Sequence, residues 1–270
     1  WSFLQLNALP DAEVWYLGPI TLLVIWRLCG NSEVVALWQP KRSFAEPGNL
    51  IKVEQDSVHK EIAILEMNHK PFNGFNKRFM DEFNNTLEHL ENSDTCRGVI
   101  LASAIPSIFS AGLDITQMYQ KPRDHTAALW DSLHEFSMRL YGTSLVTVAA
   151  VNGHATAGGC LISLSCDYRI MVEGKYNVGF SANRLGVVTP FWVQEIMKKA
   201  CGERIMEMSF QKGTLFVPDE ALAIGLADEL VAREELMRAA RTQILKWLEI
   251  PDHARVTTKR MLRMPLIEKA

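Results

Sequence analysis

Apolar and polar residues follow regular patterns from residue 51 onward. Residues 51–54 alternate between the two kinds, and residues 61–67 follow after a short polar break, which predicts a β-hairpin. In residues 75–90 the apolar positions recur every three or four residues, which predicts an amphipathic helix with one buried stripe. That stripe consists of Phe79, Met80, Phe83, Leu87 and Leu90.

Three continuous apolar runs are typical of strands that are buried on both faces. They are residues 98–103, 146–151 and 168–172, and a helix that opens with glycines separates the last two. After Pro190 the pattern becomes mostly helical. We therefore expect an α/β domain over residues 49–270 with a helical tail from about residue 190. The expected helices of the tail are residues 191–200, 204–210, 219–224, 234–248 and 254–263.

Residues 1–48 do not share these patterns. Residues 14–26 are uncharged and mostly apolar, but a membrane-spanning helix needs about 20 such residues, so membrane association is not favoured. Acidic rather than basic residues precede this run, unlike in a signal peptide, and only residues 41–44 hint at a mitochondrial presequence. The sequence opens on Trp1, which suggests a fragment, a processed product or an imperfect gene model. We expect a non-native or disordered leader, a targeting leader or a membrane anchor.

Composition and charge narrow the function classes. The formal net charge of −3 provides no basic surface for nucleic acid. Five cysteines occur without a C-x-x-C pair and without histidines at metal-ligand spacing, so we expect no metal site. Scattered cysteines in apolar stretches are typical of reduced core residues. For Cys160, packing in the core is the simpler interpretation, and a catalytic thiol is the alternative.

Two segments, residues 108–115 and 152–161, place small residues where a strand gives way to a helix. Small residues allow a ligand to approach the backbone, and the first N–H groups of a helix have no partner within it. Two such turns that face each other could direct two N–H donors at one developing oxyanion. Either turn by itself is more typical of a tight turn that allows close packing.

Taken together, these segments resemble the crotonase superfamily of enoyl-CoA hydratases and isomerases, and its mitochondrial Δ3,Δ2-enoyl-CoA isomerase branch in particular. The resemblance extends over residues 51–263 and includes five motifs, of which the last two along the chain favour the isomerase branch. The motifs are Phe109-Ser-Ala-Gly-Leu-Asp114, Ala157-Gly-Gly-Cys-Leu161, Cys166-Asp-Tyr-Arg-Ile170, Leu185-Gly186 with Pro190-Phe-Trp192, and Ile250-Pro-Asp-His-Ala-Arg255.

The resemblance implies a spiral of ββα turns with a C-terminal helical region that makes a homotrimer. It implies an acyl-CoA thioester as ligand, with coenzyme A as part of the substrate and no separate cofactor. It further implies a role in fatty-acid β-oxidation, in the mitochondrial matrix rather than the peroxisome. The oxyanion donors would be the N–H groups of Ala111 and Gly158. The substrate-binding residues would be Ala111, Gly112, Leu113, Asp114, Ile115 and Gly158.

The chain departs from the family at both catalytic carboxylates. The first glutamate of the hydratases falls at Leu161, which excludes their mechanism of water addition. The glutamate that the isomerases keep, which moves a proton from C2 to C4, falls at Ala182. A methyl group cannot carry a proton. The substitutes considered for this base are Glu173, Glu195 and His154, with His154 more simply a bystander; the neighbours Asn183 and Arg184 are not bases at neutral pH.

Three functions remain open from the sequence. The first is an isomerase impaired at Ala182, the second a non-catalytic acyl-CoA-binding paralogue or assembly subunit, and the third another reaction such as thioester hydrolysis. Phe191 and Trp192 could touch the acyl chain but are more typical of core. The cations Arg255, Lys259 and Arg260 either reach CoA phosphates or form a solvated helix face.

Overall fold

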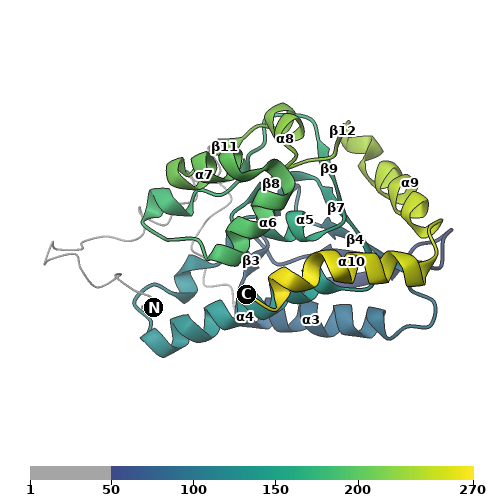
Figure 1. Ribbon diagram of the computed structural model, residues 1–270, viewed down its shortest axis with the longest axis horizontal. Coiled ribbons are helices and arrows are strands. Elements are labelled where there is room, and N and C mark those ends of the chain that lie inside the picture. Colours follow the sequence, from purple (N-terminus) through teal and green to yellow (C-terminus); the bar gives the residue numbers. More distant parts are fainter. Residues whose placement is uncertain (1–49) are drawn as a thin grey trace, which may run out of the picture. The chain divides into compact units, whose positions relative to one another are not determined.

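The structure is a computed structural model that describes residues 50–270. The expectations for residues 1–48 therefore lie outside the described part of the chain. Within residues 50–270, no helix is both long enough and apolar enough to cross a membrane. Helices surround three sheets in this region (Figure 1).

The largest sheet has six strands in the order β1-β2-β4-β7-β9-β12. β1 and β2 are antiparallel, with Ile51 opposite Met67, and all other neighbours are parallel. The predicted hairpin and the three predicted buried strands are confirmed. The bounds are β1 Ile51–Gln55, β2 Ile62–Met67, β4 Gly98–Ser103, β7 Val146–Val151, β9 Tyr168–Val172 and β12 Glu229–Val231.

A second sheet receives one strand after each of three strands of the first: β5 follows β4, β8 follows β7, and β10 follows β9. Its order is β11-β10-β8-β5, and a further pair joins β3 to β6. This repetition is the expected ββα spiral. The second-sheet strands were not predicted, because two to four residues are too few to show a period. The bounds are β3 Gly74–Phe75, β5 Ser107–Ser110, β6 Gly112–Leu113, β8 Gly153–Thr156, β10 Val178–Gly179 and β11 Leu215–Phe216.

The predicted helix of residues 75–90 is α3 (Lys77–Glu91), and its predicted stripe is buried. The Asn76 side chain caps its N-terminus by accepting a hydrogen bond from the N–H of Phe79 at 2.8 Å. Helix α4 (Arg123–Gly142) packs beside α3 (Figure 1) and was missed. Its buried side chains recur at helical spacing and could have revealed it: Leu129, Leu133, Phe136 and Leu140.

The expected helical tail is confirmed, with differences at its ends. The strand β12 interrupts it and joins the main sheet beside β9. Helix α10 extends beyond its expected bounds on both sides, with Pro265 inside it. The helices are α5 Gly158–Ser165, α6 Phe191–Cys201, α7 Glu203–Lys212, α8 Pro218–Ile224, α9 Leu236–Leu248 and α10 Asp252–Ile267, with 3₁₀ turns η1 Ile115–Gln117, η2 Ala182–Leu185 and η3 Arg233–Glu235.

Candidate active site

The two glycine-bearing turns meet in the structure. A Cβ atom added to Gly112 would lie 2.2 Å from the backbone nitrogen of Gly158, and one added to Gly158 would lie 2.9 Å from the Cα of Gly112. These backbones therefore approach more closely than any side chain would permit. Gly112 also has a φ of +83°, which other residues rarely adopt. The turns face each other, as the sequence-based hypothesis requires.

Gly158 opens α5, a helix whose eight residues are all buried. The first N–H groups of a helix have no partner within it, and no acceptor for the N–H of Gly158 lies among residues 50–270. A Cβ on Gly159 would lie 2.1 Å from the carbonyl oxygen of Ser110, so β5 packs directly against this helix end. The N-terminus of a helix carries partial positive charge. The N–H of Gly158 is thus placed to stabilise an anionic oxygen.

The expected donor of the first turn needs correction. The N–H of Ala111 donates to the carbonyl oxygen of Phe72 at 3.0 Å, and the N–H of Gly112 donates to Ser110 Oγ at 3.0 Å. Backbone donors that are bound in this way are not free for a ligand. This first turn also leads into the short 3₁₀ turn η1 and not, as expected, into an α-helix.

Leu113 is the remaining candidate donor of the first turn. It pairs with Phe75 across the parallel strands β6 and β3, and the N–H of Asp114 donates to the carbonyl oxygen of Phe75 at 3.0 Å. In a parallel pair, successive N–H groups point to opposite sides of the strand. The N–H of Leu113 is therefore directed away from β3. Leu113 directly follows Gly112, the residue in contact with Gly158.

The other residues expected at the substrate are half-buried beside this turn. Asp114 caps η1, because its Oδ1 accepts hydrogen bonds from the N–H and the hydroxyl of Thr116 at 3.0 and 2.7 Å. Its side chain thus fixes the turn, while Leu113 and Ile115 on either side of it carry apolar side chains. These two apolar side chains are suited to pack against an uncharged part of a ligand.

Ala182 follows β10, the strand that runs beside the second turn. The N–H of Ala157 donates to the carbonyl oxygen of Gly179 at 2.8 Å, so β10 runs beside this turn and leads directly into Ser181 and Ala182. Ala182 is half-buried at the start of η2. Two buried hydroxyls, of Thr156 and Ser181, have no hydrogen-bond partner among residues 50–270. The sequence analysis did not single out either residue. Their position in the chain could have indicated them, because Thr156 lies two residues before Gly158 and Ser181 directly precedes Ala182.

The three candidate substitute bases lie in different parts of the fold. His154 lies in β8, where burial lowers its pKa and its Nδ1 accepts from the N–H of Asn177 at 3.1 Å. Its ring packs edge-on against Tyr176. Glu173 is exposed at a hollow of about 360 Å³ between β12 and α9, and Glu195 is half-buried on α6. His154 is therefore explained by packing.

The cysteines among residues 50–270 are all free thiols. Burial raises the pKa of Cys160 far above its usual value and that of Cys166 to about 12. A thiol is nucleophilic only as the thiolate, so Cys160 is a core residue. No group of three or more histidine, cysteine or acidic residues in residues 50–270 is arranged to hold a metal ion.

The structure also places the residues that could contact the acyl chain or the CoA phosphates. Trp192 is buried against His134, with ring centroids 5.4 Å apart, whereas Phe191 is exposed. Arg255 and Lys259 neither reach outward nor form a solvated face, because both are buried against backbone carbonyls and carboxylates. Arg260 alone of these cations is exposed.

Known proteins that are similar to this chain show its family and fold. The profile of the Enoyl-CoA hydratase/isomerase family matches residues 57–266. The chain is 41% identical over 223 residues to mouse mitochondrial enoyl-CoA delta isomerase 1, which covers 82% of this chain and 76% of the mouse protein. The human protein of the same name is 41% identical over 203 residues, covering 75% and 67%.

A solved structure shares the fold. The crystal structure of human mitochondrial Δ3,Δ2-enoyl-CoA isomerase superimposes with a TM-score of 0.79 at 39% identity, covering 82% of this chain and 85% of that one. An enoyl-CoA hydratase/isomerase family protein from Pseudomonas syringae superimposes with a TM-score of 0.75 at 26% identity, covering 81% and 92%. The chain thus has the crotonase fold and belongs to the enoyl-CoA hydratase/isomerase family.

Proposed function

We propose that this chain binds an acyl-CoA thioester between its two glycine-bearing turns. The N–H groups of Gly158 and Leu113 would hold the thioester oxygen. The observation that carries this proposal is the contact between Gly112 and Gly158 beside a free N–H at the start of a buried helix. A donor in a water-poor site stabilises an oxyanion far better than water does. Coenzyme A is part of the substrate, and no separate cofactor or metal is needed.

The reaction we propose is that of a Δ3,Δ2-enoyl-CoA isomerase in fatty-acid β-oxidation, at reduced rate. A 3-enoyl thioester loses a proton from C2, the two N–H groups stabilise the enolate oxygen, and protonation at C4 leaves the double bond at C2. Ala182 and Leu161 supply no proton carrier. Loss of a positioned base costs about 10²–10⁴ in rate. The enolate donors remain, so the expected rate is low rather than zero.

The second candidate is a non-catalytic acyl-CoA-binding paralogue or an assembly subunit. Ala182 favours it, since the turn and its donors are suited to hold a thioester whether or not a base is present. The closeness of the relatives favours the isomerase. The acyl-CoA-binding paralogue shares its ligand with the isomerase, so these two differ only in turnover.

Two measurements on one preparation test the proposal. Calorimetric titration with a saturated acyl-CoA measures binding, and turnover of 3-hexenoyl-CoA measures isomerisation. We expect binding together with slow turnover. Gly158→Asp is the matched control, since a carboxylate would fill and repel the thioester oxygen, and it should abolish binding. Binding without turnover would select the non-catalytic candidate, release of CoA would reveal thioester hydrolysis, and no binding at millimolar ligand would refute the proposal.

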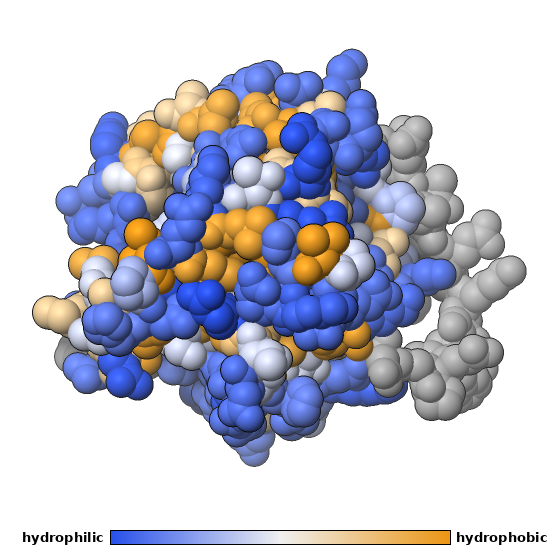
Figure 2. All heavy atoms as spheres, turned by 90° about the vertical axis from the view of Figure 1, so that its right-hand side faces the viewer, coloured by the Kyte–Doolittle hydropathy of each residue, from blue (hydrophilic) through white to orange (hydrophobic). Residues whose placement is uncertain are grey.

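We further propose a homotrimer in the mitochondrial matrix. The relatives are named mitochondrial proteins, and large apolar side chains remain exposed in the helical tail. Figure 2 shows apolar surface gathered between hydrophilic side chains on one face of the molecule. Light scattering tests the assembly, and organelle fractionation tests the location. The exposed apolar side chains of the tail include Leu222, Ile250, Met261 and Leu262.

A further inference from the structure

Helix α10 carries a cation at every fourth position on its inner face. The side chains of Arg255, Lys259 and Arg263 are only 7%, 9% and 15% exposed. Met261 and Leu262, between the last two, are exposed on the opposite side. Cations that are buried in this way require partners, because an unpaired charge inside a protein is costly. The partners of these cations show which part of the fold this face of α10 contacts.

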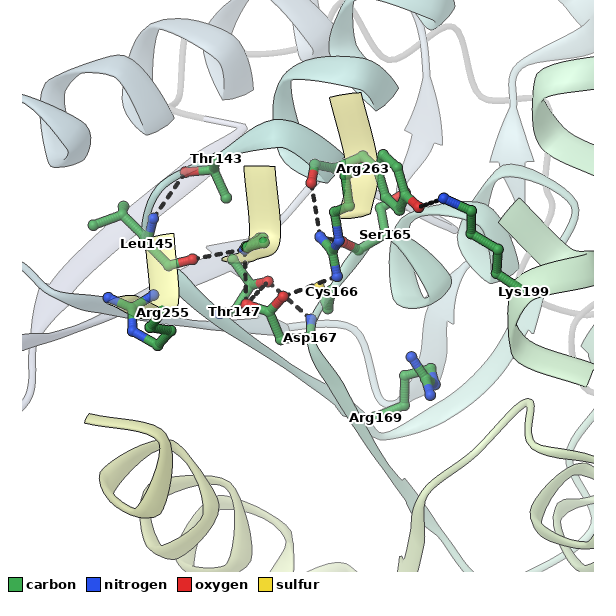
Figure 3. A network of polar contacts seen from close by, with 12 residues as sticks. Thr143, Leu145, Thr147, Ser165, Cys166, Asp167, Arg169, Lys199, Arg255 and Arg263 are labelled. Carbon is green, nitrogen blue, oxygen red and sulfur yellow. Dashed lines mark hydrogen bonds and ion pairs between the residues drawn. The ribbon is translucent and has the colours of Figure 1, made fainter. Parts of the chain in front are cut away.

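Lys259 and Arg263 converge on the carboxylate of Asp167. Lys259 Nζ lies 2.8 Å from Asp167 Oδ2, and Arg263 Nη2 lies 2.8 Å from Asp167 Oδ1. The same carboxylate accepts a hydrogen bond from the N–H of Thr147 at 2.9 Å. Figure 3 shows Asp167 held between Thr147 and Arg263. Arg263 Nη1 also donates to the carbonyl oxygen of Ser165 at 3.0 Å.

Ser165 and Asp167 lie at the C-terminal end of α5, and Gly158 opens its other end. Eight helical residues span about 12 Å. Every residue of this helix is buried, so it is held on all sides and a shift at one end moves the other. Two cations and one carboxylate leave a net charge of +1 at the C-terminal end. A cation is favoured at this end of a helix, and its Coulomb attraction extends to a negative oxygen at the N-terminus.

We propose that Lys259 and Arg263 are positioning residues for the oxyanion site: α10 clamps the C-terminal end of α5 and so sets the place and the field of the Gly158 N–H. The inference rests on the proposed binding of an acyl thioester. It assigns the last helix of the chain a part in ligand polarisation, through a buried helix, without contact to the ligand.

The titration of Lys259 gives a readout that a purely structural contact would lack. Burial lowers the pKa of Lys259 to about 8, against the opposing effect of Asp167. The other groups that face it are the Arg263 guanidinium and the thiol of Cys166, whose pKa burial raises to about 12. Burial opposes the charge of Asp167, but the two cations hold its pKa below the usual range. Between pH 7 and pH 9 only Lys259 changes charge in this cluster.

The test compares the affinities of the whole chain for an acyl-CoA and for its thioether analogue, which lacks the carbonyl oxygen. Their ratio isolates the oxyanion site. We expect Lys259→Met to lower this ratio about three- to tenfold, the effect of one positive charge on a half to a full negative charge about 12 Å away in a medium of dielectric constant about 20. Lys259→Arg should retain the ratio. Arg260→Met removes an exposed neighbouring charge and should leave the ratio unchanged.

The wild-type ratio should also fall as pH rises from 7 to 9, and that of Lys259→Arg should not. An unchanged ratio in Lys259→Met, or a wild-type ratio that is flat with pH, would overturn the inference while leaving acyl-CoA binding intact. If Lys259→Met does not fold, the wild-type and Lys259→Arg pH profiles decide. Failure of the wild type to bind acyl-CoA would overturn the proposed function and this inference together.

Discussion

Placing a carboxylate at Ala182 tests the proposal that this site lacks only a general base. Ala182→Glu should raise turnover of 3-hexenoyl-CoA about 10²–10⁴-fold, the usual contribution of a positioned general base. At about 1.36 kcal/mol per tenfold change, this is about 2.7–5.4 kcal/mol of transition-state stabilisation. The donors that would stabilise the enolate are backbone groups, so the substitution leaves them unchanged.

The surroundings of Ala182 favour a carboxylate that works as a base. The position is half-buried, and partial burial raises the pKa of a carboxyl group toward neutrality. Arg184, the nearest cation along the chain, donates to the carbonyl oxygen of Lys212 at 3.2 Å and packs under Gly213, so it is engaged elsewhere. The gained activity should therefore rise with pH through the pKa of the new carboxylate, which must be ionised to accept a proton.

Steady-state kinetics of three proteins decide the matter: the unmodified chain, Ala182→Glu and Ala182→Gln. The amide has nearly the same shape as the carboxyl group and cannot accept the proton, so it controls for packing. Equal rates for the two variants would refute the reasoning, because the gain would then not come from a base. High activity in the unmodified chain would show that the base lies elsewhere.

Three further predictions concern the site, the stability and the assembly. Gly112→Ala should weaken acyl-CoA binding at least tenfold in calorimetry, since its Cβ would meet Gly158 N at 2.2 Å; unchanged affinity would place the ligand elsewhere. Asp56 pairs with Arg241 at 2.5 Å, and although burial raises its pKa, this pair and two backbone donors lower it to about 2. The ionised Asp56 should stabilise the fold fully above the unfolded pKa of 3.8, and this contribution should be lost as pH falls toward 2. Asp56→Asn should therefore lower the free energy of unfolding in urea by about 1–2 kcal/mol at pH 6 and by progressively less below pH 3.8. A loss that is independent of pH would contradict this. A chain truncated to begin at Gly48 should scatter light as a trimer, and a stable monomer would count against the proposed assembly.

The sequence by itself predicted five of the six strands of the main sheet and showed which residue types stand at the positions of the family's carboxylates. Continuous apolar runs such as residues 98–103 and 146–151 predict buried strands because only a strand covered on both faces has no polar side. The stripe of α3 followed from its spacing. That Ala182 and Leu161 carry no titratable group follows from residue type alone.

Only the tertiary structure decided which backbone donors are free. The sequence does not distinguish the backbone N–H groups of Ala111 and Leu113 as donors. They differ because β3 lies beside this turn and the carbonyl oxygen of Phe72 accepts a hydrogen bond from the N–H of Ala111. Backbone hydrogen bonds of this kind depend on which strand becomes the neighbour, and side chains do not encode them directly.

The burial of the cations on α10 could not be predicted from the sequence either. A cation at every fourth position is compatible with a solvated face as much as with a buried one. Asp167, the partner that buries Lys259, lies 92 residues away in the chain. Pairing over such a distance results from the packing of α10 against the end of α5, and no local pattern reports it.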